Sequence, residues 1–92
     1  MKMQMNWKQA VATIEACVLC GAYGTQVAHR NEGKGMGLKV GDHLCAALCH
    51  VCHHEIDNGA RLERAERRAL MDRAIVITFD RLVQAGRIRV VP

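Results

Sequence analysis

Two short stretches decide the fold of this chain: CVLC at residues 17–20 and CHVC at residues 49–52. In each stretch the two cysteines stand three positions apart, a spacing that lets two thiolates occupy adjacent corners of a tetrahedron. Two such pairs supply the four sulfur ligands of a structural zinc site. The spacing therefore predicts one zinc ion per chain, bound by Cys17, Cys20, Cys49 and Cys52.

The chain is short, and its apolar core is expected to be small. It has 92 residues, half of them hydrophobic, but it contains a single Trp, a single Tyr and a single Phe. A domain of this size buries a limited share of its surface and often needs a metal or a cross-link to fold. We expect one domain over residues 1–92, stabilised in part by the metal. The fifth cysteine, Cys45, is predicted to be a buried thiol that binds no metal.

The N-terminal residues favour a cytosolic protein in which the cysteines stay reduced. Lys8 and Glu15 interrupt any apolar run there, so no signal-peptide pattern is visible. Nowhere does the sequence approach the roughly 20 apolar residues of a membrane-spanning helix. Clustered cysteines in the cytosol bind metal more often than they form disulfides. We therefore expect a cytoplasmic protein that makes no contact with a membrane.

The second cysteine pair also matches two other cofactor motifs. CHVCH at residues 49–53 has the pattern of c-type haem attachment. Cys45 together with the second pair has the spacing of a radical-SAM cluster. Both alternatives leave the first pair without a role; haem attachment normally takes place outside the cytosol, and radical-SAM enzymes need a far larger barrel. We therefore predict zinc and no haem.

Local sequence signals predict the elements on either side of the cysteine pairs. Residues 6–15 are expected to form a short helix with Asn6 as its N-cap. Residues 25–29 and 44–48 are strand candidates, and the four glycines between them indicate a loop over residues 30–42.

The second half of the chain is predicted to be mainly helical. A helical turn is expected to begin near His53 and to end at the DNG turn of residues 57–59. A long helix should follow over residues 61–85, capped by Gly86, with a break or bend possible near Asp72. Its predicted apolar stripe consists of Leu62, Ala65, Ala69, Val76, Phe79 and Val83. Residues 87–91 alternate in polarity and predict a final edge strand.

Two histidines occupy positions that suit chemistry. His29 ends the first strand candidate, and His53 directly follows the last cysteine. On a helix, His53 and Asp57 stand at i and i+4 on one face, a spacing that suits two ligands of one metal ion. Of the other histidines, His43 and His50 are predicted to face solvent and His54 to point elsewhere.

The stretch from Cys17 to Gly59 resembles the HNH, or ββα-metal, nucleases in their zinc-stapled form, in which two CxxC pairs flank a catalytic hairpin and helix. Three segments are similar to the YbcO-like prophage nucleases: VAHR at 27–30, GKGMGLKVGDHL at 33–44 and CHVCHHEIDNG at 49–59. The resemblance implies a small α+β zinc-stapled domain with a ββα-metal core over residues 17–59. An N-terminal helix precedes this core, and a long helical part follows over residues 60–86.

The same resemblance implies roles for individual residues. His29 would be the general base, and His53 would bind a catalytic divalent ion, Mg²⁺ or another such as Mn²⁺, Ni²⁺ or Zn²⁺. Many of these enzymes carry a second ligand directly before the base, where this sequence has Ala28, and we take Asp57 as its substitute. Asn31 is a weaker candidate for orienting the base.

Basic residues near the expected site could hold a phosphate backbone. Arg30, Lys34 and Lys39 flank it in the glycine-rich loop. Arg61, Arg64 and Arg68 share a helix face that either extends this track or is simply solvated.

The resemblance implies metal-dependent hydrolysis of phosphodiester bonds, in phage DNA processing or recombination within the cytosol of the phage-infected or bacterial host. The formal net charge of +4 permits a nucleic-acid partner without requiring one. The alternative is a non-catalytic zinc module that binds DNA or a protein.

Overall fold

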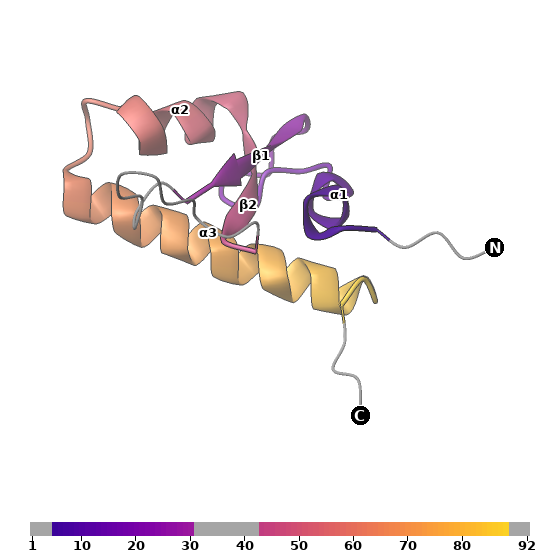
Figure 1. The fold of residues 1–92 in the computed structure, drawn as a ribbon. Coiled ribbons are helices and arrows are strands. Elements are labelled where there is room, and N and C mark those ends of the chain that lie inside the picture. The colour runs from indigo at the N-terminus through magenta and orange to yellow at the C-terminus, as the bar shows by residue number, and fades with distance from the viewer. Residues whose placement is uncertain (1–4, 31–42, 89–92) are drawn as a thin grey trace.

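The computed structural model describes residues 5–30 and 43–88. Along the chain it contains α1 (Trp7–Ala12), β1 (Thr25–His29), β2 (Cys45–Cys49), α2 (His50–Asn58) and α3 (Arg64–Gln84). Figure 1 shows the long α3 running along one side of the molecule, with the two strands packed above it and α1 and α2 towards opposite ends. The predicted small α+β fold with an N-terminal and a long C-terminal helix is confirmed. None of the helices in the described ranges is long and apolar enough to cross a membrane.

The two strands pair antiparallel, as the central ribbon in Figure 1 shows. Thr25 lies opposite Cys49 and His29 lies opposite Cys45, so the pairing covers both strands from end to end. Every residue of β2 is buried, whereas in β1 only Ala28 is buried and Gln26 is exposed. Both strands form where the sequence predicts them, β2 within one residue. The predicted glycine-rich loop falls mainly on residues 31–42, outside the described part of the chain.

One residue of β2 attaches two other parts of the molecule to the sheet. The backbone N–H of Ala47 donates to Oγ1 of Thr78 on α3, at 3.3 Å. The backbone carbonyl of Ala47 accepts from the N–H of Val18, inside the first cysteine pair, at 3.1 Å. This second bond brings the two cysteine pairs to the same end of the sheet, although they are far apart in sequence.

The long helix α3 is confirmed, but its buried face differs from the predicted stripe. The residues that it buries are Met71, Ala74, Ile75, Thr78 and Leu82. Val76 and Val83 of the predicted stripe are 67% and 55% exposed. The bond from Ala47 to Thr78 turns a polar residue toward the sheet, and the neighbouring apolar positions follow it into the core. The helix continues through Asp72 without a break.

At two helix ends, local sequence signals were sufficient to predict the capping residue. Asn6 is the N-cap of α1, as predicted, and it also forms a capping box with Gln9. The helix ends earlier than predicted, at Ala12. Gly86 has φ +72° and closes α3 with the paired backbone bonds of a Schellman motif. No strand forms at residues 87–88, and the rest of the predicted edge strand lies outside the described residues.

The start of α2 was predicted wrongly. The helix begins at His50, three residues before the predicted position. Its N-cap is Cys49, whose Sγ accepts a hydrogen bond from the backbone N–H of Cys52 at 3.4 Å. The sulfur replaces the oxygen of an ordinary capping side chain, so the second cysteine pair is itself the first turn of the helix.

Candidate metal centre and adjoining pocket

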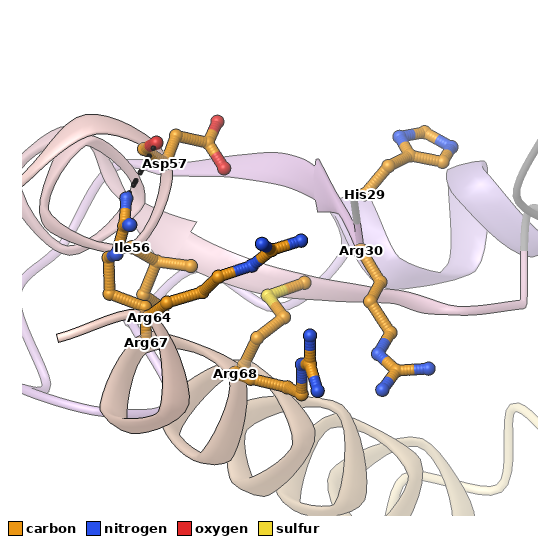
Figure 2. Close-up of a pocket in the computed structure, with 8 residues that line it drawn as sticks. His29, Arg30, Ile56, Asp57, Arg64, Arg67 and Arg68 are labelled. Carbon is orange, nitrogen blue, oxygen red and sulfur yellow. Dashed lines mark hydrogen bonds between the residues drawn. The ribbon is translucent and has the colours of Figure 1, made fainter. Parts of the chain in front are cut away.

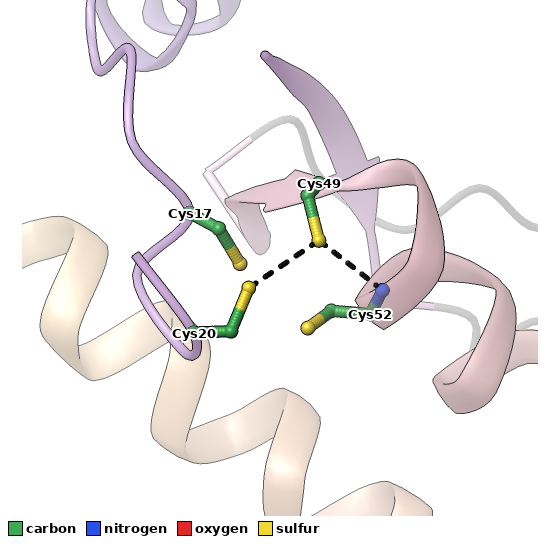
Figure 3. Close-up of side chains that lie close together, drawn as sticks. All are labelled: Cys17, Cys20, Cys49 and Cys52. Atoms are coloured by element: carbon green, nitrogen blue, oxygen red, sulfur yellow. Dashed lines mark hydrogen bonds between the residues drawn. The ribbon is translucent and has the colours of Figure 1, made fainter. Parts of the chain in front are cut away.

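The four predicted cysteines come together in the structure. The Sγ atoms of Cys17, Cys20, Cys49 and Cys52 all lie within 4.8 Å of one another, and Figure 3 shows the four thiols turned toward a common centre. Around a tetrahedral zinc ion with Zn–S bonds of about 2.3 Å, neighbouring sulfurs would be about 3.8 Å apart. The Sγ atoms of Cys20 and Cys49 are 3.5 Å apart. The cluster can therefore hold a metal ion such as zinc with small adjustments of the side chains.

The backbone around the first cysteine pair forms a tight turn. The N–H of Cys17 donates to the carbonyl of Ala22 at 2.8 Å, and the N–H of Gly21 donates back to the carbonyl of Cys17 at 2.9 Å. Gly21 has φ +80°, a conformation that a residue with a side chain adopts only with strain. This turn points both thiols of the pair in the same direction.

The cluster favours at least one thiolate before any metal binds. Burial raises the pKa of Cys17, but hydrogen bonds from the backbone around Cys49, Cys20 and Leu19 lower it more, to about 6. Burial and the neighbouring thiols raise the pKa of Cys52. A lowered pKa at Cys17 beside a raised pKa at Cys52 is what close packing of sulfurs produces, because the negative charge on one opposes a charge on the next. A divalent cation would remove that opposition.

Cys45 lies apart from this cluster. It is fully buried at the start of β2, opposite His29. The prediction of a buried thiol next to the second cysteine pair is therefore confirmed.

On α2, His53 and Asp57 form the pair that their spacing predicts. Nε2 of His53 lies 3.0 Å from Oδ2 of Asp57, and both side chains are 27% exposed. The other ring nitrogen, Nδ1, lies 2.8 Å from Oε1 of Gln26 on β1. Because an amide oxygen only accepts, Nδ1 carries the proton in this arrangement and donates it. Gln26 thereby fixes the ring so that Nε2 faces Asp57.

A pocket next to this pair contains His29. It is lined by His29 and Arg30 at the end of β1, Ile56 and Asp57 on α2, and Arg64, Arg67, Arg68 and Met71 on α3. Figure 2 shows His29 and Asp57 on opposite sides of the pocket, with arginine side chains from α3 extending between them. Arg67 also donates from Nη1 to the backbone carbonyl of Asp57 at 3.3 Å, which ties α3 to the end of α2. The pocket thus combines an imidazole, a carboxylate and several guanidinium groups.

Some predicted residues lie elsewhere or have other partners. Arg30 forms an ion pair with Asp72 of α3, with Nε 2.9 Å from Oδ1. Arg61 is exposed, and its Nε lies 3.4 Å from Oε2 of Glu55. Ala28 has no ligand atom in its side chain, and at 1% exposed it packs in the core. The predictions for Asn31, Lys34 and Lys39 fall outside the described residues.

The prediction that His54 points away from His53 is wrong. His43 and His50 are exposed, as predicted, but His54 does not point away from His53. A surface hollow is lined by Gln26, His50, His53, His54, Asp57 and Asn58. All four ionisable members, His50, His53, His54 and Asp57, therefore gather on one face of α2.

Sequence reasoning missed two residues of this region, Gln26 and Arg67. Gln26 precedes the base candidate by three positions on β1, on the strand face turned toward α2. Arg67 lies off the helix face of Arg61, Arg64 and Arg68 that the sequence singles out. Strand alternation could have flagged Gln26, whereas the position of Arg67 depends on how α3 packs against α2.

Comparisons of this chain with protein-family models, with curated proteins and with solved structures found no match.

Proposed function

We propose that this chain is a metal-dependent endonuclease that hydrolyses phosphodiester bonds in nucleic acid, with DNA as its substrate. The observation that carries the proposal is the position of Asp57. Its carboxylate contacts His53 on one side, and the same residue lines the pocket of His29 on the other. A candidate general base, His29, therefore lines the same pocket as one of the two candidate metal ligands, Asp57, and such an arrangement suits hydrolysis at one phosphate.

The arginines of α3 would hold the substrate. Arg64, Arg67 and Arg68 line the pocket from one side, and guanidinium groups match phosphate oxygens in charge and geometry. Within the described residues, Nε of Arg67 is buried and has no hydrogen-bond partner. A phosphate oxygen entering the pocket would offer an acceptor for such a donor, which is costly to leave buried and unpaired.

His29 would act as the general base. A neutral imidazole can accept a proton from the water that attacks the phosphorus atom. The pairing of β1 with β2 and the packing of α2 on the sheet fix the strand end that carries His29 relative to Asp57. In this proposal the phosphate would bind between Asp57 and the arginines. His29 would contact the attacking water on the side of the phosphorus atom opposite the leaving oxygen.

The side chains of His53 and Asp57 fit a divalent ion. Two ligand atoms at right angles around an ion, with bonds of about 2.1 Å, would be about 3 Å apart. Nε2 of His53 and Oδ2 of Asp57 are 3.0 Å apart. When bound, such an ion would stabilise negative charge on the phosphate and on the departing 3′ oxygen. Mixed nitrogen and oxygen ligation accepts Mn²⁺, Ni²⁺ or Zn²⁺ as well as Mg²⁺.

A zinc ion in the cysteine cluster would have a structural role in this proposal. One zinc per chain, with all four positions taken by Cys17, Cys20, Cys49 and Cys52, would leave no open position for substrate. Its effect would be to join the first cysteine pair to the β2–α2 junction. That junction positions His53 and Asp57 on α2, so the metal would act on catalysis only through the fold.

A second function remains in competition: a non-catalytic zinc module that binds DNA or a protein partner. The alanine at position 28 favours it, because this side chain has no ligand atom and the ion of the proposed nuclease would rely on His53 and Asp57. In that case the arginine pocket would bind phosphate without cleaving it.

A plasmid-nicking assay separates the two functions. The purified protein is incubated with supercoiled plasmid and Mg²⁺, Mn²⁺ or Ni²⁺, beside the variants His29→Ala and His43→Ala. We expect the wild type and His43→Ala, which removes an exposed histidine outside the pocket, to nick DNA. We expect His29→Ala to lose about 10²–10⁴-fold in rate, the usual contribution of a general base.

The outcomes are distinct. Nicking that persists unchanged in His29→Ala would remove this residue from the mechanism. No nicking by the wild type with any ion, together with retained DNA binding, would establish the binding module instead. Zinc content and circular dichroism of each variant confirm that the fold is intact.

A further inference from the structure

One face of α2 carries more metal-binding groups than a single catalytic ion needs. His50, His53, His54 and Asp57 follow one another at i, i+3, i+4 and i+7 and line the same surface hollow. His53 and Asp57 contact each other, and Gln26 holds the remaining ring nitrogen of His53. His50 and His54 are exposed, and within the described ranges neither side chain is engaged in a hydrogen bond or an ion pair.

His50 and His54 have the spacing at which two helical imidazoles bind one metal ion. Side chains at i and i+4 lie on the same face of a helix, with Cβ atoms about 5–6 Å apart, and paired histidines at this spacing bind zinc in metalloproteases. Because both rings are exposed, they can change rotamer within picoseconds to nanoseconds and converge on an ion. Two imidazoles favour a nitrogen-preferring transition ion over Mg²⁺ or Ca²⁺.

The charge of α2 also favours a bound cation. The helix His50–Asn58 contains two carboxylates, Glu55 and Asp57, and no lysine or arginine. Asp57 lines the hollow, and a divalent cation beside it would offset the negative charge on this face of α2. A phosphate backbone reaching the neighbouring arginine pocket would then meet less repulsion from this side.

We propose that His50 and His54 form a second cation site on α2, specific for a divalent transition ion of the Zn²⁺, Ni²⁺ or Cu²⁺ type. This site is separate from the cysteine cluster and from the His53–Asp57 pair. It requires only that α2 be helical and exposed on this face, so it does not depend on nuclease activity.

The test is a titration of the zinc-loaded, reduced protein with Ni²⁺ by isothermal calorimetry. NMR of ¹⁵N-labelled histidine rings, which paramagnetic Ni²⁺ broadens, identifies the ligands. We expect about two Ni²⁺ per chain in addition to the tightly held zinc. The double variant His50→Gln, His54→Gln should lose one of them, whereas His43→Gln, an exposed histidine away from α2, should lose neither.

His53→Gln distinguishes this site from its neighbour. It should lose the ion of the His53–Asp57 pair and keep the one whose binding broadens the rings of His50 and His54. The proposal is overturned if the double variant binds as much Ni²⁺ as the wild type, or if His53→Gln abolishes all Ni²⁺ binding, since one shared ion would then explain the data. A wild-type protein that binds no Ni²⁺ would overturn it equally.

Discussion

Replacing one cysteine of the cluster tests whether metal binding and folding are a single process in this chain. Cys49 ends β2, caps α2 through its sulfur and belongs to the four-sulfur cluster. In Cys49→Ser the hydroxyl can still accept the hydrogen bond from the N–H of Cys52, because serine is a good N-cap. The substitution therefore removes the metal ligand and preserves the cap.

The expected loss can be worked from general magnitudes. Structural zinc sites contribute about 10–16 kcal/mol of binding free energy, so an even share for one of four ligands is about 2.5–4 kcal/mol. A chain of 92 residues has a total stability of about 5–14 kcal/mol, at roughly 0.05–0.15 kcal/mol per residue. Since about 1 kcal/mol shifts Tm by about 4–8 °C at this size, we expect Tm to fall by at least about 10 °C.

Two measurements on the same samples check this expectation: zinc content by elemental analysis and Tm by circular dichroism. The wild type should hold about one zinc, and Cys49→Ser should hold much less and melt earlier. Cys45→Ala is the matched control, because it removes a fully buried thiol from the same strand but outside the cluster. It should keep its zinc. A Cys49→Ser protein with full zinc content and unchanged Tm would refute the coupling of metal binding to folding.

Three further predictions address the packing and the pocket. Thr78→Val leaves the buried N–H of Ala47 without its acceptor and should lower the free energy of unfolding by about 1–3 kcal/mol in urea denaturation, whereas Thr78→Ser should keep the hydrogen bond. Gly86→Ala meets no atom within 4 Å but forces φ +72° on a residue with a Cβ, so thermal melts should show a loss of about 1 kcal/mol. Arg64→Gln combined with Arg68→Gln should weaken DNA binding and reduce the slope of log affinity against log salt concentration by about one unit per lost phosphate contact. If fluorescence anisotropy shows the same slope as for the wild type, neither arginine contacts a phosphate.

Elements with a local cause could be predicted from the sequence. The cap at Asn6 depends on residues within one helical turn, and the cysteine pairs have a spacing that few other structures require. The start of α2 could not be predicted, because a cysteine sulfur serves there as the cap. The buried face of α3 was wrong for a different reason: the helix offers two apolar stripes, and its contact with Ala47 through Thr78 selects the one that contains a polar residue.

The part of the candidate site that depends on local spacing was predictable from the sequence. His53 and Asp57 lie one turn apart on one helix, so their contact follows from spacing alone. The pocket that joins His29 to Arg67 requires β1, α2 and α3 to be packed together, and no local pattern states that arrangement. Gln26 belongs to this second class, since its role as a partner of His53 depends on strand-to-helix packing.

The two bonds of Ala47 have a consequence for solubility. A sheet of only two strands has as much unpaired backbone as paired, and such a row of open groups is a template on which another chain can add a strand and begin to aggregate. On β2 the outward-facing N–H and C=O of Ala47 are already taken, by α3 and by the first cysteine pair. At Ala47, β2 therefore offers no free backbone group to which a strand of another chain could bind, although β2 pairs with β1 alone. If a metal in the cluster holds the first cysteine pair in place, its removal should free the carbonyl of Ala47 and make the apo-protein more prone to aggregation.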